Sequence, residues 1–136
     1  MLNKRSTQQG ITFIGLVFVL GFIAILVVFA VRVFPLYNEK IQIVAAMNSL
    51  ANRPDSGSLS VDDIRKSFLK NLNATTNINR FNSQNLKEHV EVVKGEAKGD
   101  PKQMRVHYEA TNKLVADLQL LLVFDEYRPL NEGKSD

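Results

Sequence analysis

The side chains best suited to chemistry in this sequence are two histidines, each followed two residues later by a glutamate. His89 precedes Glu91 and His107 precedes Glu109, both within segments of alternating apolar and polar residues. Imidazole nitrogens and carboxylate oxygens are ligands for zinc and related metals, so two paired strands would bring a candidate metal site together. The polar face of a strand normally points to solvent. We therefore interpret all four side chains as solvated and predict no metal and no cofactor.

Other catalytic patterns in the sequence are incomplete. Ser67 and Lys70 have the S-x-x-K spacing of serine acyltransferases, but the accompanying S-D-N and K-T-G motifs are absent from the sequence. The sequence contains no cysteine, which excludes thiol nucleophiles and thiolate metal sites. Gly95 and Gly99 flank a charged turn rather than open a phosphate-binding helix. We therefore predict that the protein is not an enzyme and has no small-molecule substrate.

A long apolar run near the N-terminus indicates a membrane anchor. From Gly10 to Val31 no residue is charged, and Thr12 is the one clearly polar side chain. A helix of this length reaches roughly 33 Å, enough to cross the hydrocarbon core of a bilayer. The run is longer than the apolar part of a cleaved secretory signal, and no A-x-A-like site follows it. We predict an uncleaved transmembrane helix over residues 11–33.

Charges on either side of this run predict its orientation. Lys4 and Arg5 precede it, and the first ten residues contain no acidic side chain, whereas Arg32 and Lys40 follow it. By a narrow margin the positive-inside rule favours a cytoplasmic N-terminus, an inner-membrane location and a periplasmic remainder. Arg32 is expected to extend to the outer headgroups, with Tyr37 as an aromatic anchor beside it.

The part after the run has no charge surplus that would suit nucleic acid. Two of the 17 Lys and Arg residues precede the run, so the others nearly balance the 14 Asp and Glu residues. A nucleic-acid partner needs a basic surface, and none is expected here. The lipid bilayer and another membrane or periplasmic protein are the partners we predict.

The hydrophobic pattern after the run predicts two helices. Pro35 is expected to kink or break the chain near the membrane surface, and helical spacing then continues to about Asn52. A loop follows, and Ser60 is placed to cap a second helix over residues 60–73. One stripe of that helix is apolar, formed by Val61, Ile64, Phe68 and Leu72.

Three antiparallel strands are predicted after the helices. Period-two alternation covers residues 86–93 and 103–110, and the loop between them is expected to be long and mobile. Residues 114–127 fit either a strand or a helix, and a turn at 111–113 favours a strand. Helices and sheet must cover one another's apolar faces, which predicts an α+β domain with a pilin-like layout. The predicted boundaries are a basic leader at 1–10, the transmembrane helix at 11–33, a periplasmic domain at 34–130 and a flexible tail at 131–136.

The start of the run resembles a pilin precursor that lacks one residue. Pilins carry an acidic side chain five residues into the mature chain, which can pair with the N-terminal amine of a neighbouring subunit. Counting from Ile11, the fifth residue is Gly15, so this contact is removed. Gly10 and Ile11 still form a candidate processing site. In the alternative interpretation Gly10 and Gly15 are packing residues of an uncleaved anchor, and Gly15, Gly21 and Ala24 let another membrane helix approach closely.

Four segments together resemble a proteobacterial single-span inner-membrane family of unknown function. They are QQGITFIGL, VFPLYNEKIQIVAAMNSLA, DDIRKSFLKNLN and VHYEATNKLVADLQLLLVFD. The family is similar to pilins at the N-terminus, and its genes often lie beside those for signal peptidase I and ribonuclease III. The resemblance extends from about Gln8 to Tyr127 and implies an inner-membrane location and a periplasmic domain, but no reaction.

Two functions remain open at this point. The first is a non-enzymatic envelope component whose small periplasmic domain binds another protein, as an accessory subunit of a machine such as signal peptidase. The second is a minor pilin-like or pseudopilin subunit that is processed after Gly10.

Overall fold

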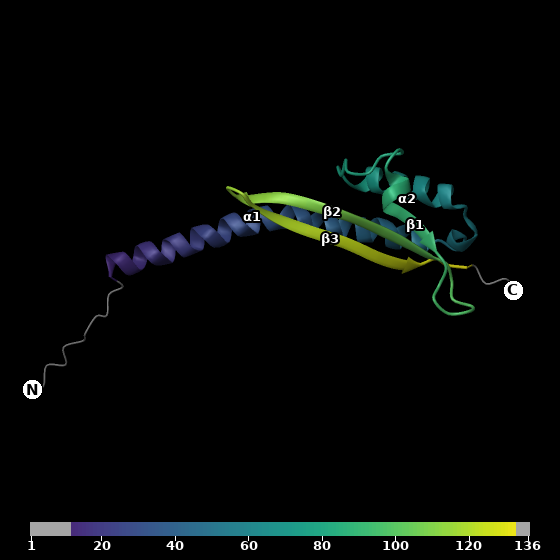
Figure 1. Ribbon diagram of the computed structural model, residues 1–136, viewed down its shortest axis with the longest axis horizontal. Coiled ribbons are helices and arrows are strands. Elements are labelled where there is room, and N and C mark those ends of the chain that lie inside the picture. Colours follow the sequence, from purple (N-terminus) through teal and green to yellow (C-terminus); the bar gives the residue numbers. More distant parts are fainter. Residues whose placement is uncertain (1–11, 133–136) are drawn as a thin grey trace, which may run out of the picture.

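The computed structural model describes residues 12–132, and its longest element is one helix of 39 residues, α1 (Phe13–Ala51). Thr12 caps this helix, because its hydroxyl oxygen accepts a hydrogen bond from the Gly15 N–H at 3.3 Å. The N-terminal end of α1 projects beyond the other elements, whereas the rest of the helix lies beside them (Figure 1). One helix therefore contains both the apolar run and a segment that packs on the sheet.

Helix α1 continues through Pro35, so the predicted break in the helix is wrong. Proline cannot donate to the carbonyl of Val31 and costs about 3 kcal/mol in a helix interior. Two tertiary contacts support this turn. Leu36 is buried in the core, and the side-chain amide of Asn112 donates to the carbonyl oxygen of Arg32 at 3.0 Å. The predicted membrane helix and the predicted helix after Pro35 are one element.

After α1 a short 3-10 turn, η1 (Ser56–Ser58), leads into α2 (Val61–Thr75). The Ser60 cap is confirmed, because its hydroxyl accepts from the Asp63 N–H at 3.2 Å and donates to the Asp63 carboxylate at 2.6 Å. Most of the predicted apolar stripe is buried, namely Ile64, Phe68 and Leu72. Both the start of α2 and the face it buries therefore follow from local sequence.

Half of the segment predicted as the first strand is helical instead. It forms α3 (Leu86–His89), and only β1 (Val90–Val93) is extended. The Asn82 side chain favours this turn, because its Oδ1 accepts hydrogen bonds from two backbone N–H groups that follow, both at 2.9 Å. Leu86 and Val90 are both buried, so helical i, i+4 spacing achieves the burial that alternation predicted.

The sheet has the order β1-β2-β3 and is antiparallel, with β2 (Gln103–Val115) and β3 (Leu118–Pro129) forming a long hairpin. The predicted third strand is confirmed, but the predicted turn at 111–113 is wrong. The chain turns at Ala116 and Asp117, and Ala116 has φ of +49°, a conformation that favours glycine. Strand β2 continues through Asn112, which pairs with Leu120 of β3 and whose side chain donates to α1.

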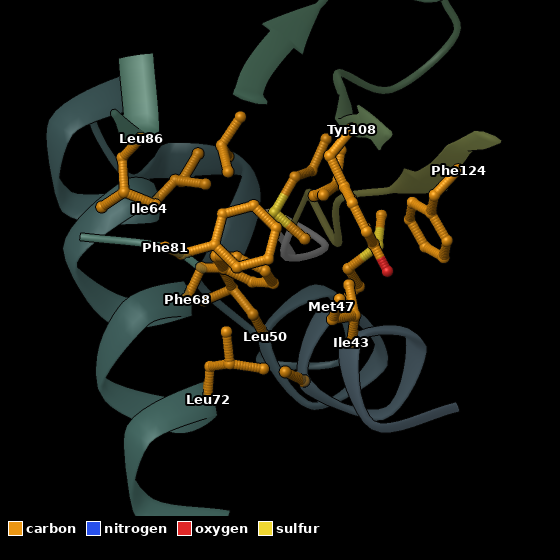
Figure 2. Packing of buried hydrophobic residues seen from close by; sticks show 14 of the residues in the cluster. Ile43, Met47, Leu50, Ile64, Phe68, Leu72, Phe81, Leu86, Tyr108 and Phe124 are labelled. Atoms are coloured by element: carbon orange, nitrogen blue, oxygen red, sulfur yellow. The ribbon is translucent and has the colours of Figure 1, made fainter. Parts of the chain in front are cut away.

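Both long helices pack on one face of the sheet, α1 against β2 and β3 and α2 against β1. Phe81 lies at the centre of the core between Phe68 and Tyr108, with edge-to-face centroid distances of 5.7 and 5.4 Å (Figure 2). Tyr108 also stacks on Phe124 at 5.0 Å. The predicted α+β class is therefore confirmed, with an N-terminal apolar helix, two further helices and a three-stranded antiparallel sheet.

The chain after β3 is fastened to the loop after α1. Ser56 is fully buried, and its hydroxyl donates to the Ala51 carbonyl at 3.0 Å and accepts from the Asn131 N–H at 2.7 Å. The Gly57 N–H donates to the Asn131 carbonyl at 2.9 Å. A Cβ at Gly57 would lie 2.7 Å from the Glu132 side chain, so glycine allows this close approach.

Candidate functional site

The N-terminal half of α1 is apolar, and none of its described residues is buried. An 18-residue window of the helix has a mean hydropathy of 3.2, and none of it is buried. This helix is long and apolar enough to cross a membrane, which is compatible with a single-pass anchor. A Cβ placed at Gly21 would meet no described atom within 4 Å, so this face of the helix is open to a neighbour.

The tip of the β2–β3 hairpin lies against this apolar half. Leu114 and Val115 line an apolar depression of about 240 Å³ together with four side chains of α1, those of Ala24, Ile25, Val28 and Phe29. Figure 1 shows the hairpin running along α1 toward its N-terminal half, farther than α2 does. The folded part and the apolar run are therefore in direct contact.

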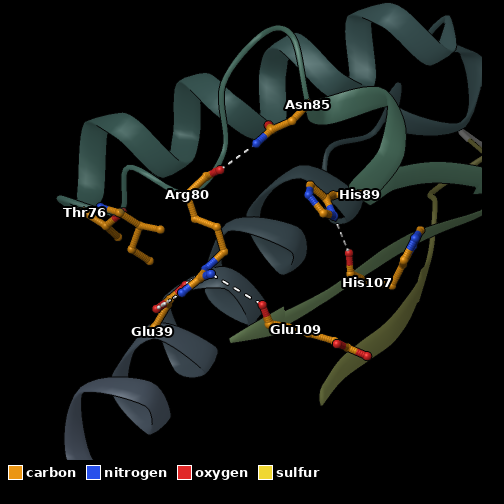
Figure 3. A network of polar contacts seen from close by, with 8 residues as sticks. Glu39, Thr76, Arg80, Asn85, His89, His107 and Glu109 are labelled. Carbon is orange, nitrogen blue, oxygen red and sulfur yellow. Dashed lines mark hydrogen bonds and ion pairs between the residues drawn. The ribbon is translucent and has the colours of Figure 1, made fainter. Parts of the chain in front are cut away.

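Arg80 joins the chain that follows α2 to α1 and β2 (Figure 3). Its Nε donates to Oε1 of Glu39 in α1 at 2.7 Å, and its Nη1 donates to the Glu109 carbonyl of β2 at 3.5 Å. Its guanidinium lies 5.3 Å from the centre of the Tyr108 ring. The hydrogen bond to Glu39 raises the pKa of Arg80 above its ordinary value. Asn85 holds the backbone of Arg80 by donating to its carbonyl at 2.8 Å.

An open groove of about 800 Å³ lies beside this ion pair, between α1 and the chain that follows α2. Its lining is rich in amides and hydroxyls, contributed by Asn38, Gln42, Asn73, Thr75, Thr76, Asn77 and Asn79. Glu39 and Arg80 are the titratable residues in the lining, and they neutralise each other. Amide groups donate and accept hydrogen bonds but do not transfer protons at neutral pH. The groove therefore suits binding of a polar chain better than acid–base catalysis.

The outer face of the sheet, opposite the helices, is uncovered in the described part of the chain. Arg105 is at its centre and donates from two nitrogens to the Asp125 carboxylate, both at 2.8 Å, with Glu91 at 3.5 Å. The bond from Arg105 lowers the pKa of Asp125, and Asp125 in turn raises the pKa of Arg105. Three apolar or aromatic side chains lie along β3 on the same face, Leu121, Val123 and Tyr127, with exposed fractions of 57%, 63% and 44%. These side chains and Arg105 are called the outer-face row below.

A family model described as a domain of unknown function, DUF4845, matches residues 32–124. The chain belongs to the DUF4845 family. The match begins at Arg32, where the apolar run ends, and finishes in β3, so it contains the polar groove and most of the sheet. Comparison with curated proteins and with solved structures gave no match. Membership of a family of unknown function, as the sequence resemblance implied, is thereby confirmed.

Within the DUF4845 domain the two histidines come together, but not as two residues of facing strands. His89 ends α3, and its Nδ1 lies 3.0 Å from the His107 carbonyl oxygen, with the two rings 6.1 Å apart. Glu91 bonds instead to Arg105, and the Glu109 side chain is exposed. Among residues 12–132 no group of three or more His, Asp and Glu side chains is placed to hold a metal.

The remaining predicted residues occupy separate places. Ser67 is half-buried on α2, and Lys70 is exposed. The side chains of Arg32 and Tyr37 are exposed, as interface anchors would be. Four other predicted site residues, Lys4, Arg5, Gly10 and Ile11, lie outside the described residues.

Two features of the folded part were not singled out from the sequence. One is the Glu39–Arg80 pair, whose members are 41 residues apart. The other is the Arg105–Asp125 pair, which the alternation of β2 and β3 could have placed on one face had the register been known. A lone arginine between Ile78 and Phe81, in an asparagine-rich loop, was the available signal for the first.

Proposed function

We propose that the chain is a non-enzymatic single-pass inner-membrane protein whose DUF4845 domain binds another membrane or periplasmic protein. The N-terminus is cytoplasmic and the domain periplasmic. The observation that carries this proposal is the outer-face row, where Leu121, Val123 and Tyr127 are exposed on a face that no described element covers.

The chemistry of the outer-face row suits a protein partner. Arginine and tyrosine beside apolar side chains are the composition enriched at the centres of protein interfaces. Arg105 lies 5.4 Å from the Tyr127 ring and is already paired with Asp125, so these groups are held in place before a partner arrives. A sheet face is broad and flat, whereas sites for small molecules are concave.

The choice of partner rests on the family resemblance read from the sequence. Genes of the similar family often lie beside that of signal peptidase I, which directs the proposal to an accessory or assembly role for that membrane machine. Gene position is an association, and it names the first candidate to test.

Site-specific photocrosslinking in intact membranes tests the proposal. A photoreactive residue at Leu121 or Val123 is expected to capture one dominant partner, identified by mass spectrometry. The matched control carries the same residue at Arg53, an exposed position just after α1, the helix that packs on the opposite face of the sheet. Capture of signal peptidase supports an accessory or assembly role for that enzyme. Equal capture patterns from Val123 and Arg53 would remove the outer-face row as a binding surface.

The second function, a minor pilin-like subunit, is favoured by the unbroken α1. A single helix that is free and apolar in its first half and packed on a sheet in its second half could enter a helical filament. Gly15 offers no carboxylate for the usual contact between subunits. Mass spectrometry of the membrane-extracted protein separates the two, since a mature N-terminus at Ile11 supports the pilin-like function and an intact leader supports the anchor.

A further inference from the structure

The β2–β3 hairpin extends past the level at which the apolar run of α1 ends. Asn112 pairs with Leu120 across the hairpin, and its side-chain amide donates to the Arg32 carbonyl at 3.0 Å. Arg32 is the first charged residue after the uncharged run, which ends at Val31. Residues 113–119 therefore lie beside the uncharged run rather than beyond it.

Two independent lengths agree on how far the hairpin reaches. Leu114 and Val115 share a depression with α1 residues as early as Ala24, and Ala24 lies roughly 12 Å along the helix from Arg32. From Asn112 to Val115 an extended strand covers about 10 Å. The tip thus lies about 10 Å inside the end of the apolar run.

The side chains at this tip are apolar and open. Val115 and Leu118 are 57% and 67% exposed, and beside them Ile25 and Phe29 of α1 are 68% and 47% exposed. Hairpin and helix together form one continuous apolar surface. Because a bilayer must cover the helix part of this surface if α1 is an anchor, the same bilayer reaches the adjoining hairpin part.

We propose that residues 113–119 are a second membrane-contacting element, which enters the outer leaflet beside α1. This inference rests on the membrane anchorage in the proposed function. Asp117 at the turn and Lys113 limit the depth, because a charged side chain is costly among the acyl chains, whereas Val115 and Leu118 beside the turn are apolar. The tip is therefore seated at the boundary between headgroups and acyl chains. Two contacts with the leaflet, one helix and one hairpin, would fix the orientation of the DUF4845 domain over the membrane.

The chain contains no tryptophan, so a single introduced tryptophan reports its own surroundings. The experiment uses the full chain in phosphatidylethanolamine–phosphatidylglycerol vesicles with acyl chains brominated near the headgroup or near the bilayer centre. Leu118→Trp is the test variant, and Leu118 is exposed, so the change removes no core contact. Tyr127→Trp is the matched control on the same strand, far from the tip, and Phe18→Trp reports the anchor itself.

The expected result is blue-shifted emission of Leu118→Trp and at least twofold quenching by bromines near the headgroup, with little quenching of Tyr127→Trp. Phe18→Trp should be quenched most by bromines near the bilayer centre. If Phe18→Trp is quenched but Leu118→Trp behaves like Tyr127→Trp, the hairpin inference fails and the anchorage stands. Blue-shifted emission of Leu118→Trp without quenching by brominated lipid would mean that protein covers the tip, which also overturns it. If Phe18→Trp is not quenched, anchorage and inference fail together.

Discussion

The guanidinium of Arg80 donates to the carboxylate of Glu39 at 2.7 Å, and this pair joins the chain after α2 to the helix that carries the apolar run. Only 33% of the Arg80 side chain and 17% of the Glu39 side chain are exposed, so solvent screens the pair incompletely. The same guanidinium lies over the Tyr108 ring. Arg80 therefore lines the polar groove and also contacts the aromatic core through Tyr108.

Replacing this arginine should destabilise the domain. Arg80→Ala is expected to lower the free energy of unfolding by about 1–2 kcal/mol, because the ion pair and the contact with Tyr108 are both lost. Urea titration of the full chain in detergent, followed by circular dichroism, measures the change. Arg53→Ala removes an exposed arginine and should cost less than about 0.5 kcal/mol. A double-mutant cycle that combines Arg80→Ala with Glu39→Gln should give a coupling energy of about 0.5–1 kcal/mol. A coupling energy of zero would show that the ion pair does not contribute to stability.

Removing the Tyr108 hydroxyl should stabilise the domain. The hydroxyl oxygen is buried and has no hydrogen-bond partner within residues 12–132. An unsatisfied buried hydroxyl costs about 1–3 kcal/mol, so Tyr108→Phe is expected to raise the melting temperature at pH 7. Phenylalanine keeps the stacking on Phe124 and the edge contact with Phe81. A lower melting temperature for Tyr108→Phe would mean that the hydroxyl is paired after all.

The same substitution should flatten the stability profile at alkaline pH. Burial raises the pKa of Tyr108 above its ordinary value near 10, so the folded state keeps the proton that the unfolded state loses. Stability from this residue is complete below about pH 10 and falls as the pH rises above that value. Melting temperatures from pH 8 to 11 should therefore fall more steeply for the natural chain than for Tyr108→Phe. Parallel curves would contradict this account.

Asp125 should contribute stability that disappears in acid. Its pKa is lowered by the hydrogen bonds from Arg105, so the carboxylate is more acidic in the folded state than in the unfolded state. A lowered pKa gives stability above the unfolded value of about 3.9, which is lost as the pH falls through the lower folded value. The melting-temperature difference between the natural chain and Asp125→Asn should be present at pH 6 and shrink below pH 4. A difference that is constant from pH 6 to pH 3 would assign the effect to packing.

Local patterns in the sequence predicted the elements that local interactions determine. The Ser60 cap and the stripe of Ile64, Phe68 and Leu72 lie within a few residues of one another, and α2 formed as expected. The third strand also followed from alternation, since Leu122 and Phe124 turn toward α1.

Contacts between distant residues decided what the sequence could not predict. The cost of Pro35 in α1 is a local property, whereas the bond that supports this turn comes from Asn112, 80 residues from its acceptor Arg32. Pairing with β3 keeps β2 extended past the predicted turn, and the actual turn at Ala116 lacks a glycine or asparagine signal. Sequence patterns likewise could not pair Glu39 with Arg80, because a fold must exist before two remote side chains meet.

Helix α1 is continuous from the apolar run to the part that packs on the sheet. Each residue of an α-helix turns the chain by about 100°, so adding or deleting one residue near Leu20, before the first contact with the hairpin at Ala24, would rotate the sheet by that angle relative to the N-terminal end of the helix. The direction in which Arg105 and Val123 face is thus set by the rotation of the N-terminal end of α1 about the helix axis.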